Sequence, residues 1–218
     1  GLGSSAASSV GGAVAVNALM GGPLSALDVV SCALRGEAAV SGTVHADNVA
    51  PSILGGIVLI RSSEPLDLIP LPIPAALQIV IVHPHTEVLT AKARRLVAEH
   101  RFTIGQAVTN LGNVAALVSA LFREDYPLFS RCIRDALVEP VRAPLIPGFS
   151  AVKQAALNAG ALGCSISGSG PSMLAFADSN TTADRIATAM EAAFADNGLQ
   201  SDRFVGPVNR GGASVLAD

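Results

Sequence analysis

Apolar runs alternate with glycine- and proline-rich breaks along the chain and predict a mixture of helices and strands. The stretch 6–20 is rich in small apolar residues and predicts a buried helix that ends at the glycines 21 and 22. Ser25 starts a second helix, with Asp28 three residues later as a capping-box-like acid. The predicted helices span 6–20, 25–34, 36–40, 90–98, 104–121, 127–137, 150–159 and 182–197.

Shorter β-branched and apolar runs predict strands. The segment 65–74 carries four prolines and is expected to form an edge strand and a connection, whereas the polar run 43–51 is expected to be a loop. The predicted strands span 53–62, 77–82, 164–166, 173–177, 204–208 and 213–216. Because strands and helices do not follow a strict βαβ order, the predicted class is α+β, with a domain boundary near 62–74.

The amino-acid composition and net charge argue against some classes of protein function. Half of the residues are hydrophobic and 14% are charged, which is typical of a globular protein with a substantial core. A net charge of −3, no basic block and few aromatic residues argue against nucleic-acid binding. No uninterrupted apolar run approaches the length needed to cross a bilayer, so no membrane segment is expected. Three scattered cysteines are expected to be buried thiols.

Two glycine-serine loops are candidates for a ligand site. Residues 1–5 read Gly-Leu-Gly-Ser-Ser and lead into the first predicted helix, where unpaired N–H groups and the helix dipole attract phosphate. The alternative is a flexible start or a simple helix cap. The second loop, Ile166 to Ser172, joins two apolar strands and is either a ligand-adjacent loop or an ordinary turn. No Gly-Lys-Ser/Thr follows the first loop, so it is not a P-loop.

Polar residues elsewhere supply further candidates. Glu37 can bind a hard cation, and His45 lies in a polar run that is equally explained as a solvated loop. Arg94 and Arg142 carry guanidinium groups that can bind a carboxylate, although most arginines are surface residues.

Taken together, these motifs resemble the homoserine kinases of the GHMP kinase superfamily, over essentially the whole chain. The two glycine-serine loops resemble the superfamily's phosphate loop and C-terminal glycine loop. The segments His-Ala-Asp-Asn-Val-Ala-Pro at 45–51, Glu-Pro-Val-Arg at 139–142 and Leu-Ile-Pro-Gly-Phe at 145–149 narrow the resemblance to homoserine kinases. The resemblance implies a two-domain GHMP kinase fold, with residues 1–68 in the N-terminal, ATP-binding domain and 69–218 in a ferredoxin-like C-terminal domain.

The resemblance also implies a reaction, in which ATP phosphorylates L-homoserine to O-phospho-L-homoserine on the way to threonine. ATP and Mg²⁺ would be required, and Ser5 and Glu37 would bind the metal. The phosphates of ATP would be bound by Gly1, Leu2, Gly3, Ser4, Ser5, Ala6 and Ser8. Homoserine would be bound by His45, Asp47, Asn48, Arg94, Arg142 and Gly168, with the two arginines on its carboxylate. A cytoplasmic homodimer is implied, or a plastid enzyme in a plant, without nucleic acid or membrane as partner.

The side chain at position 48 indicates whether the protein supplies a base for the reaction. Related kinases such as mevalonate kinase carry an aspartate there, usually assigned as the base, whereas an amide cannot accept a proton at neutral pH. The chain therefore resembles the branch that works without a protein base, with Asn48, Ser5 and Glu37 as its catalytic residues. The family's first β-rich segment, with the adenine pocket, has no counterpart in these residues, so this piece is expected to be N-terminally truncated and inactive alone. Another small-molecule GHMP kinase and a non-catalytic ligand-binding relative remain as alternatives.

Overall fold

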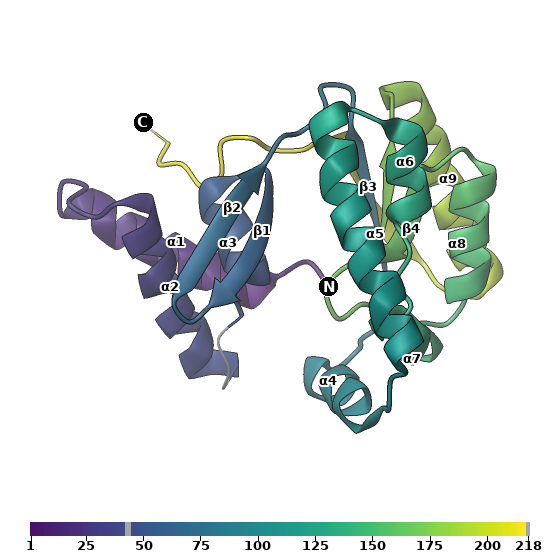
Figure 1. The fold of residues 1–218 in the computed structure, drawn as a ribbon, viewed down its shortest axis with the longest axis horizontal. Coiled ribbons are helices and arrows are strands. Elements are labelled where there is room, and N and C mark those ends of the chain that lie inside the picture. Colours follow the sequence, from purple (N-terminus) through teal and green to yellow (C-terminus); the bar gives the residue numbers. More distant parts are fainter. Residues whose placement is uncertain (42–44, 217–218) are drawn as a thin grey trace. The chain divides into compact units, whose positions relative to one another are not determined.

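A computed structural model describes residues 1–41 and 45–216. The chain divides into two compact units. The smaller unit contains residues 3–73 and the segment from Val208 onward, and the larger unit contains residues 1–2 and 74–207. Each is described separately below, and both are drawn in Figure 1.

The smaller unit packs three helices on a two-stranded antiparallel sheet. Helices α1 (Ser4–Leu19) and α2 (Ala26–Ser41) pack against each other, α3 (Ala46–Leu54) contacts both, and β1 (Ile57–Ser63) pairs with β2 (Leu66–Leu71). The core residues are small or β-branched, which lets the helices approach closely. They are Ala6, Val10, Val30, Ala33, Leu34, Ala46, Val49 and Ala50.

One sequence prediction for this unit is confirmed here, and two are wrong. The capping box of α2 is present, because Ser25 Oγ accepts from the Asp28 N–H while the Asp28 carboxylate accepts from the Ser25 N–H. The helix continues to Ser41 without a break after residue 34. The polar run 43–51 is not a loop from residue 46 onward, because Ala46, Val49 and Ala50 form an apolar face that buries α3. Residues 43 and 44 lie outside the described residues.

The larger unit is built on a four-stranded antiparallel sheet in the order β4-β5-β3-β6. The strands are β3 (Gln78–Pro84), β4 (Gly163–Ile166), β5 (Met173–Ala177) and β6 (Ser201–Pro207). Helices α8 (Phe149–Asn158) and α9 (Asn180–Asp196) pack on each other and on this sheet. The βαββαβ order confirms the ferredoxin-like prediction for this part of the chain.

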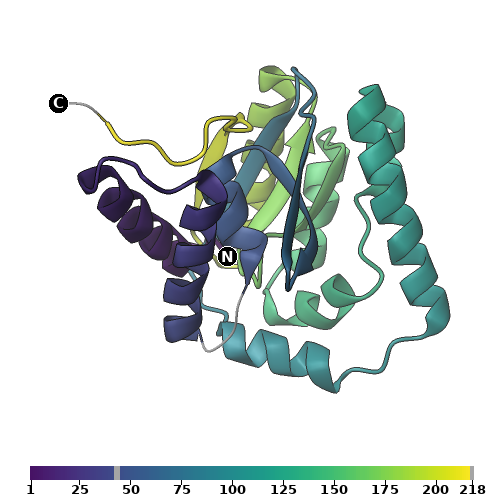
Figure 2. The same cartoon turned by 60° about the vertical axis from the view of Figure 1, so that its left-hand side comes forward.

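The remaining helices of the larger unit lie between β3 and α8 in sequence. They are α4 (Thr90–Glu99), α5 (Ile104–Arg123), α6 (Tyr126–Cys132) and α7 (Val138–Arg142), followed by the 3₁₀ turn η1 (Ala143–Leu145). Phe129 of α6 packs edge-on against Phe176 of β5, with ring centroids 5.2 Å apart. Phe176 alternates with buried Ala175 and Ala177, so α6 covers the sheet face opposite the α8–α9 core. Helix α5 packs on α6 and lies on the outside of the larger unit (Figures 1 and 2).

Three further predictions need correction. The helix expected at 127–137 ends at Cys132, and a new helix begins at Val138 because the Asp135 carboxylate accepts backbone N–H groups there. Residues 213–216 do not form a strand. Cys32 is exposed, whereas Cys132 and Cys164 are buried as expected. Burial raises the pKa of the Cys164 thiol to about 12, so it is protonated at neutral pH.

Among the described residues, α5 has the length and apolar composition of a membrane-crossing helix, although such a match alone is weak evidence.

Candidate active site

The first helix of the smaller unit begins directly after a glycine in the left-handed conformation. Gly3 has φ 67° and is the residue before α1. The first backbone bond of the helix runs from the Ala7 N–H to the Gly3 carbonyl, and in the described part of the chain no side chain caps this end. The N–H groups of Ser4, Ser5 and Ala6 therefore lie at the positive end of a 16-residue helix without a capping side chain. This geometry suits a phosphate group.

Asn48 lies beside this helix start. A Cβ placed on Gly3 would be only 3.0 Å from Asn48 Oδ1, closer than side chains tolerate. The positive φ and the Asn48 contact both require glycine at position 3. The structure thus brings together two residues that the sequence places 45 positions apart, one from the predicted phosphate loop and one from the predicted substrate site.

Ser5 and Glu37 also meet in the smaller unit. The Ser5 hydroxyl donates a hydrogen bond of 2.9 Å to Glu37 Oε1, and Glu37 is 6% exposed. A hydroxyl and a carboxylate are hard oxygen donors, and Mg²⁺ in phosphate sites typically binds one or two protein oxygens together with phosphate oxygens and water. No group of three or more His, Cys, Asp or Glu side chains that could hold a metal occurs among the described residues. The Ser5–Glu37 pair fits a magnesium ion shared with a nucleotide better than a metal held by protein ligands alone.

Three further predicted site residues lie in this unit, namely His45, Asp47 and Ser8. His45 is half-buried and precedes α3, whereas Asp47 is exposed in the first turn of that helix. Ser8 lies one turn into α1, where its hydroxyl donates to the Ser4 carbonyl. Ser8 therefore has an intrahelical partner, which sets it apart from the residues at the helix start.

In the larger unit, the C-terminal glycine loop contacts residue 1. The Ser167 hydroxyl donates to the Gly1 carbonyl at 2.7 Å, and a Cβ on Gly1 would lie 2.9 Å from Ser172 Oγ. Ser172 is fully buried, and its hydroxyl lies 2.8 Å from Nδ1 of His83 at the end of β3. Within the larger unit, the first residue of one glycine-serine motif therefore contacts the other motif. Sequence reasoning did not single out His83, although its place where a clear apolar strand ends was a usable signal.

The predicted arginines lie around the same loop. Arg142 Nη1 donates to the Gly168 carbonyl at 3.0 Å, and Gly168 has φ 57°. Arg94 is half-buried on α4, a helix that contacts α7, the helix of Arg142. Thr90, at the start of α4, lies within hydrogen-bond distance of Ser169 in the loop. Both arginines, which the sequence separates by 48 positions, thus belong to elements that surround one glycine loop.

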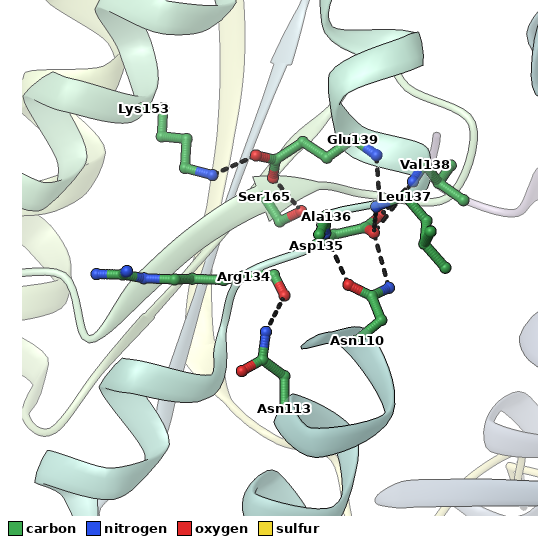
Figure 3. A network of polar contacts seen from close by, with 10 residues as sticks. All are labelled: Asn110, Asn113, Arg134, Asp135, Ala136, Leu137, Val138, Glu139, Lys153 and Ser165. Carbon is green, nitrogen blue, oxygen red and sulfur yellow. Dashed lines mark hydrogen bonds and ion pairs between the residues drawn. The ribbon is translucent and has the colours of Figure 1, made fainter. Parts of the chain in front are cut away.

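A polar network positions the Arg142 helix (Figure 3). The Asp135 carboxylate accepts hydrogen bonds from the N–H groups of residues 137–139 and from the Asn110 side chain. Burial alone would raise the pKa of Asp135, but these hydrogen bonds outweigh it, and the pKa is lowered. Glu139 of α7 forms an ion pair with Lys153 and accepts a hydrogen bond of 2.6 Å from the Ser165 hydroxyl. Asp135 was missed by sequence reasoning because a lone aspartate in a predicted helix gives no signal.

The family models match both parts of the chain. The model described as GHMP kinases N terminal domain matches residues 1–56, and the one described as GHMP kinases C terminal matches residues 117–196. The first match contains the α1 start, Glu37 and Asn48, and the second contains Arg142 and Gly168.

Comparison with individual proteins gives a narrower result. A homoserine kinase of Chlorobium phaeovibrioides is 50% identical over 99% of this chain and 68% of its own length. One from Xylella fastidiosa is 41% identical over 99% of the chain and 66% of its own length. A crystal structure of homoserine kinase from Cytophaga hutchinsonii superposes with a TM-score of 0.92 and 47% identity, covering 95% of this chain and 65% of that structure. The chain thus spans about two thirds of the length of these relatives.

A more distant likeness concerns the fold alone. The mevalonate kinase of L. major, solved in complex with R-mevalonate, has a TM-score of 0.74 and 21% identity, covering 94% of this chain and 66% of that structure.

Proposed function

Because this chain belongs to the homoserine kinases of the GHMP kinase family, we propose that it supplies the phosphate, magnesium and homoserine ligands of an ATP-dependent homoserine kinase. The reaction is the conversion of L-homoserine and ATP to O-phospho-L-homoserine and ADP, a step toward threonine. The observation that carries the proposal is the Ser5–Glu37 hydrogen bond at the uncapped start of α1, where a phosphate and its metal ion would both find ligands.

In the proposed site, the backbone N–H groups at the start of α1 bind the phosphate oxygens of ATP. The phosphate ligands are Gly1, Leu2, Gly3, Ser4, Ser5 and Ala6, with Ser8 one turn further along. Ser5 Oγ and the Glu37 carboxylate would hold Mg²⁺, which would offset the negative charge of the phosphates. The first turn of α1 contains no acidic residue, so no like charge opposes the binding of the ATP phosphates at this helix N-terminus.

The proposed homoserine ligands are the six residues that the family resemblance implies, and each is considered within its own unit. Arg142 and Arg94 bind its carboxylate through charge-assisted hydrogen bonds, and Gly168 lines the pocket through its backbone. His45, Asp47 and Asn48 contribute from the start of α3. The contact of Arg142 with Gly168 supports this assignment, because it fixes the guanidinium next to a loop whose positive φ leaves the backbone open to a ligand.

The chemical step requires alignment more than deprotonation. The homoserine hydroxyl oxygen forms a bond to the γ-phosphorus as the bond between that phosphorus and the β–γ bridging oxygen breaks, and ADP leaves with the bond electrons. The transition state is loose, so the hydroxyl proton is lost late, to solvent or to a phosphate oxygen. Asn48 orients the hydroxyl and does not accept its proton.

The same proposal includes the domain bounds of the protein, its location in the cell and its oligomeric state. The ATP-binding domain comprises residues 1–68 and the C-terminal domain residues 69–218, which is supported by a unit boundary at residues 73–74. The protein acts in the cytoplasm, which its bacterial relatives support. The family resemblance further implies a homodimer without nucleic-acid or membrane partners.

The competing function is another small-molecule GHMP kinase, for which the shared fold with mevalonate kinase is the supporting observation. The amide at position 48 favours a reaction without a protein base, unlike that of mevalonate kinase, and the two arginines favour a substrate with a free carboxylate over a neutral sugar. A non-catalytic relative would have no need of the Ser5–Glu37 pair. An assay of ATP turnover by the full-length protein with homoserine, mevalonate and galactose separates the three possibilities.

A further inference from the structure

The segment that follows the last strand belongs to the smaller unit. Strand β6 ends at Pro207 in the larger unit, whereas residues 208–216, called the C-terminal segment below, cluster with residues 3–73 (yellow in Figure 1). Val208 is buried, with 8% of its surface exposed. Residues 208–216 contain neither helix nor strand, so regular secondary structure does not explain how the segment is held in place.

Backbone atoms of the C-terminal segment lie directly against the end of α3. A Cβ placed on Gly212 would lie 2.1 Å from the Ile53 carbonyl oxygen, and one placed on Gly55 would lie 2.6 Å from the Arg210 carbonyl oxygen. No Cβ tolerates distances this short, so both sides of the contact require glycine. Gly212 and Gly55 also have positive φ values of 62° and 74°.

Two hydrogen bonds hold the same segment. The Gly56 N–H donates to the Asn209 carbonyl at 2.7 Å, and the Arg210 guanidinium donates to the Ile73 carbonyl at 2.8 Å. The C-terminal segment is therefore bonded both to the turn that ends α3 and to the connection that follows β2.

Helix α3 is short and needs such support. It has nine residues, and Pro51 in its interior lacks the N–H that would bond to the Asp47 carbonyl. Isolated helices shorter than about 12 residues are marginal in water. The buried side chains of α3 are Ala46, Val49 and Ala50, which fix the face that is turned to the core but are too short to resist sliding along the helix axis strongly. A backbone contact at the C-terminal end opposes that sliding.

The other end of α3 carries the side chain that contacts the phosphate loop. Asn48 lies in the first turn of α3, and its Oδ1 would be 3.0 Å from a Cβ placed on Gly3. Asn48 and Ile53 are separated by about 7.5 Å along the helix, at 1.5 Å per residue. Because α3 is this short, a displacement of its C-terminal end also displaces Asn48.

We propose that the C-terminal segment positions Asn48 for catalysis by fixing α3 along its axis. Gly212 is the positioning residue, because its contact with the Ile53 carbonyl is the closer of the two backbone contacts. The catalytic benefit, which is orientation of the homoserine hydroxyl by Asn48, rests on the proposed function. The placement of Asn48 by the C-terminal segment does not.

The first test compares Gly212→Ala with Gly211→Ala in the full-length protein. Gly211 is the matched control, because a Cβ on it would lie 3.7 Å from Asn209 Oδ1, an ordinary van der Waals distance. In assays with ATP, Mg²⁺ and homoserine, Gly212→Ala should lower kcat about tenfold, as expected for a misplaced orienting group, and Gly211→Ala should match the wild type. Wild-type kinetics in Gly212→Ala would overturn the proposal.

A double substitution shows whether the effect passes through Asn48. In an Asn48→Ala background, Gly212→Ala should cause almost no further loss of kcat, because the side chain that the segment positions is already gone. An equal loss in both backgrounds would indicate general damage and contradict the proposal. Arg210→Ala removes the hydrogen bond to Ile73 without adding an atom, so it serves for the same comparison if Gly212→Ala does not fold.

A measurement without substrate separates this inference from the kinase assignment. The side-chain amide of Asn48 is identified in a ¹⁵N–¹H NMR spectrum of the full-length protein by its absence in Asn48→Ala. Its resonances should shift in Gly212→Ala and Arg210→Ala and stay in place in Gly211→Ala. Unmoved resonances in the first two variants would refute the positioning role even in an active homoserine kinase. A shifted amide in a protein that does not phosphorylate homoserine would refute the proposed function alone.

Discussion

Asn48 Oδ1 lies 3.0 Å from the point that a Cβ on Gly3 would occupy, so the predicted phosphate loop and the predicted hydroxyl-orienting residue share one tight contact. Gly3→Ala should therefore disturb ATP binding by two routes. Alanine at φ 67° costs about 1–2 kcal/mol, and its methyl group displaces the Asn48 side chain. We expect a higher KM for ATP and a lower kcat in steady-state assays of the full-length protein.

Gly11→Ala is the control for this substitution. Gly11 lies in the same helix, and among the described residues nothing is within 4 Å of its added Cβ. It should raise the free energy of unfolding by about 0.5–1 kcal/mol and leave the kinetics unchanged. Equal kinetic effects of the two variants would argue against a special role for Gly3.

The proposed magnesium site predicts the behaviour of Glu37→Gln. Glutamine keeps the shape of the side chain and an oxygen that accepts from Ser5, but it removes the negative charge. The affinity for Mg²⁺, measured from the dependence of the rate on free metal, should fall by about 10–100-fold. Glu64→Gln, in the exposed turn after β1, should not change it. An unaltered metal dependence in Glu37→Gln would remove that residue from the site.

The two arginines should act on homoserine and not on ATP. Loss of a charge-assisted hydrogen bond to a carboxylate costs about 1.5–3 kcal/mol, so Arg94→Ala and Arg142→Ala should each raise the KM for homoserine roughly tenfold to a hundredfold. Arg95→Ala is the matched control, because Arg95 follows Arg94 on α4 and is exposed near Glu99. A parallel rise in the KM for ATP would instead indicate a general loss of structure.

Catalysis without a protein base predicts a limited effect at Asn48. A general base contributes typically 10²–10⁴-fold to a rate, whereas an orienting amide contributes less. Asn48→Ala should therefore lower kcat by less than about 100-fold. Asn48→Asp, which supplies a carboxylate of the same size, should not be faster than the wild type. A larger loss in the first variant, or a gain in the second, would show that proton removal limits the reaction.

The sequence predicted those parts of the fold whose signals are local. The capping box of Ser25 and Asp28 was recognised because both partners lie within one helical turn. The strand at 77–82 was predicted because its residues 79–82 form a continuous β-branched, apolar run. By contrast, α3 was mistaken for a loop, because its buried Ala46, Val49 and Ala50 are small and lie among polar residues.

Features that depend on distant contacts could not be predicted in this way. The break between α6 and α7 depends on Asp135, whose role is visible only when Asn110 and the N–H groups of residues 137–139 surround it. The same applies to His83, which reaches Ser172 across 89 residues. The functional assignments of Ser5, Glu37 and the two arginines came from family resemblance. The structure adds that Ser5 meets Glu37, and that Arg142 meets the glycine loop. Their roles in catalysis stay predictions.

The central claim is that this chain serves phosphoryl transfer to homoserine. The most direct test is the formation of ADP by the full-length protein with ATP and Mg²⁺, measured separately with L-homoserine, mevalonate and galactose. ADP should form only with homoserine, and ³¹P NMR should identify the second product as O-phospho-L-homoserine. Comparable turnover with mevalonate or galactose, or no turnover with any of the three, would contradict the assignment.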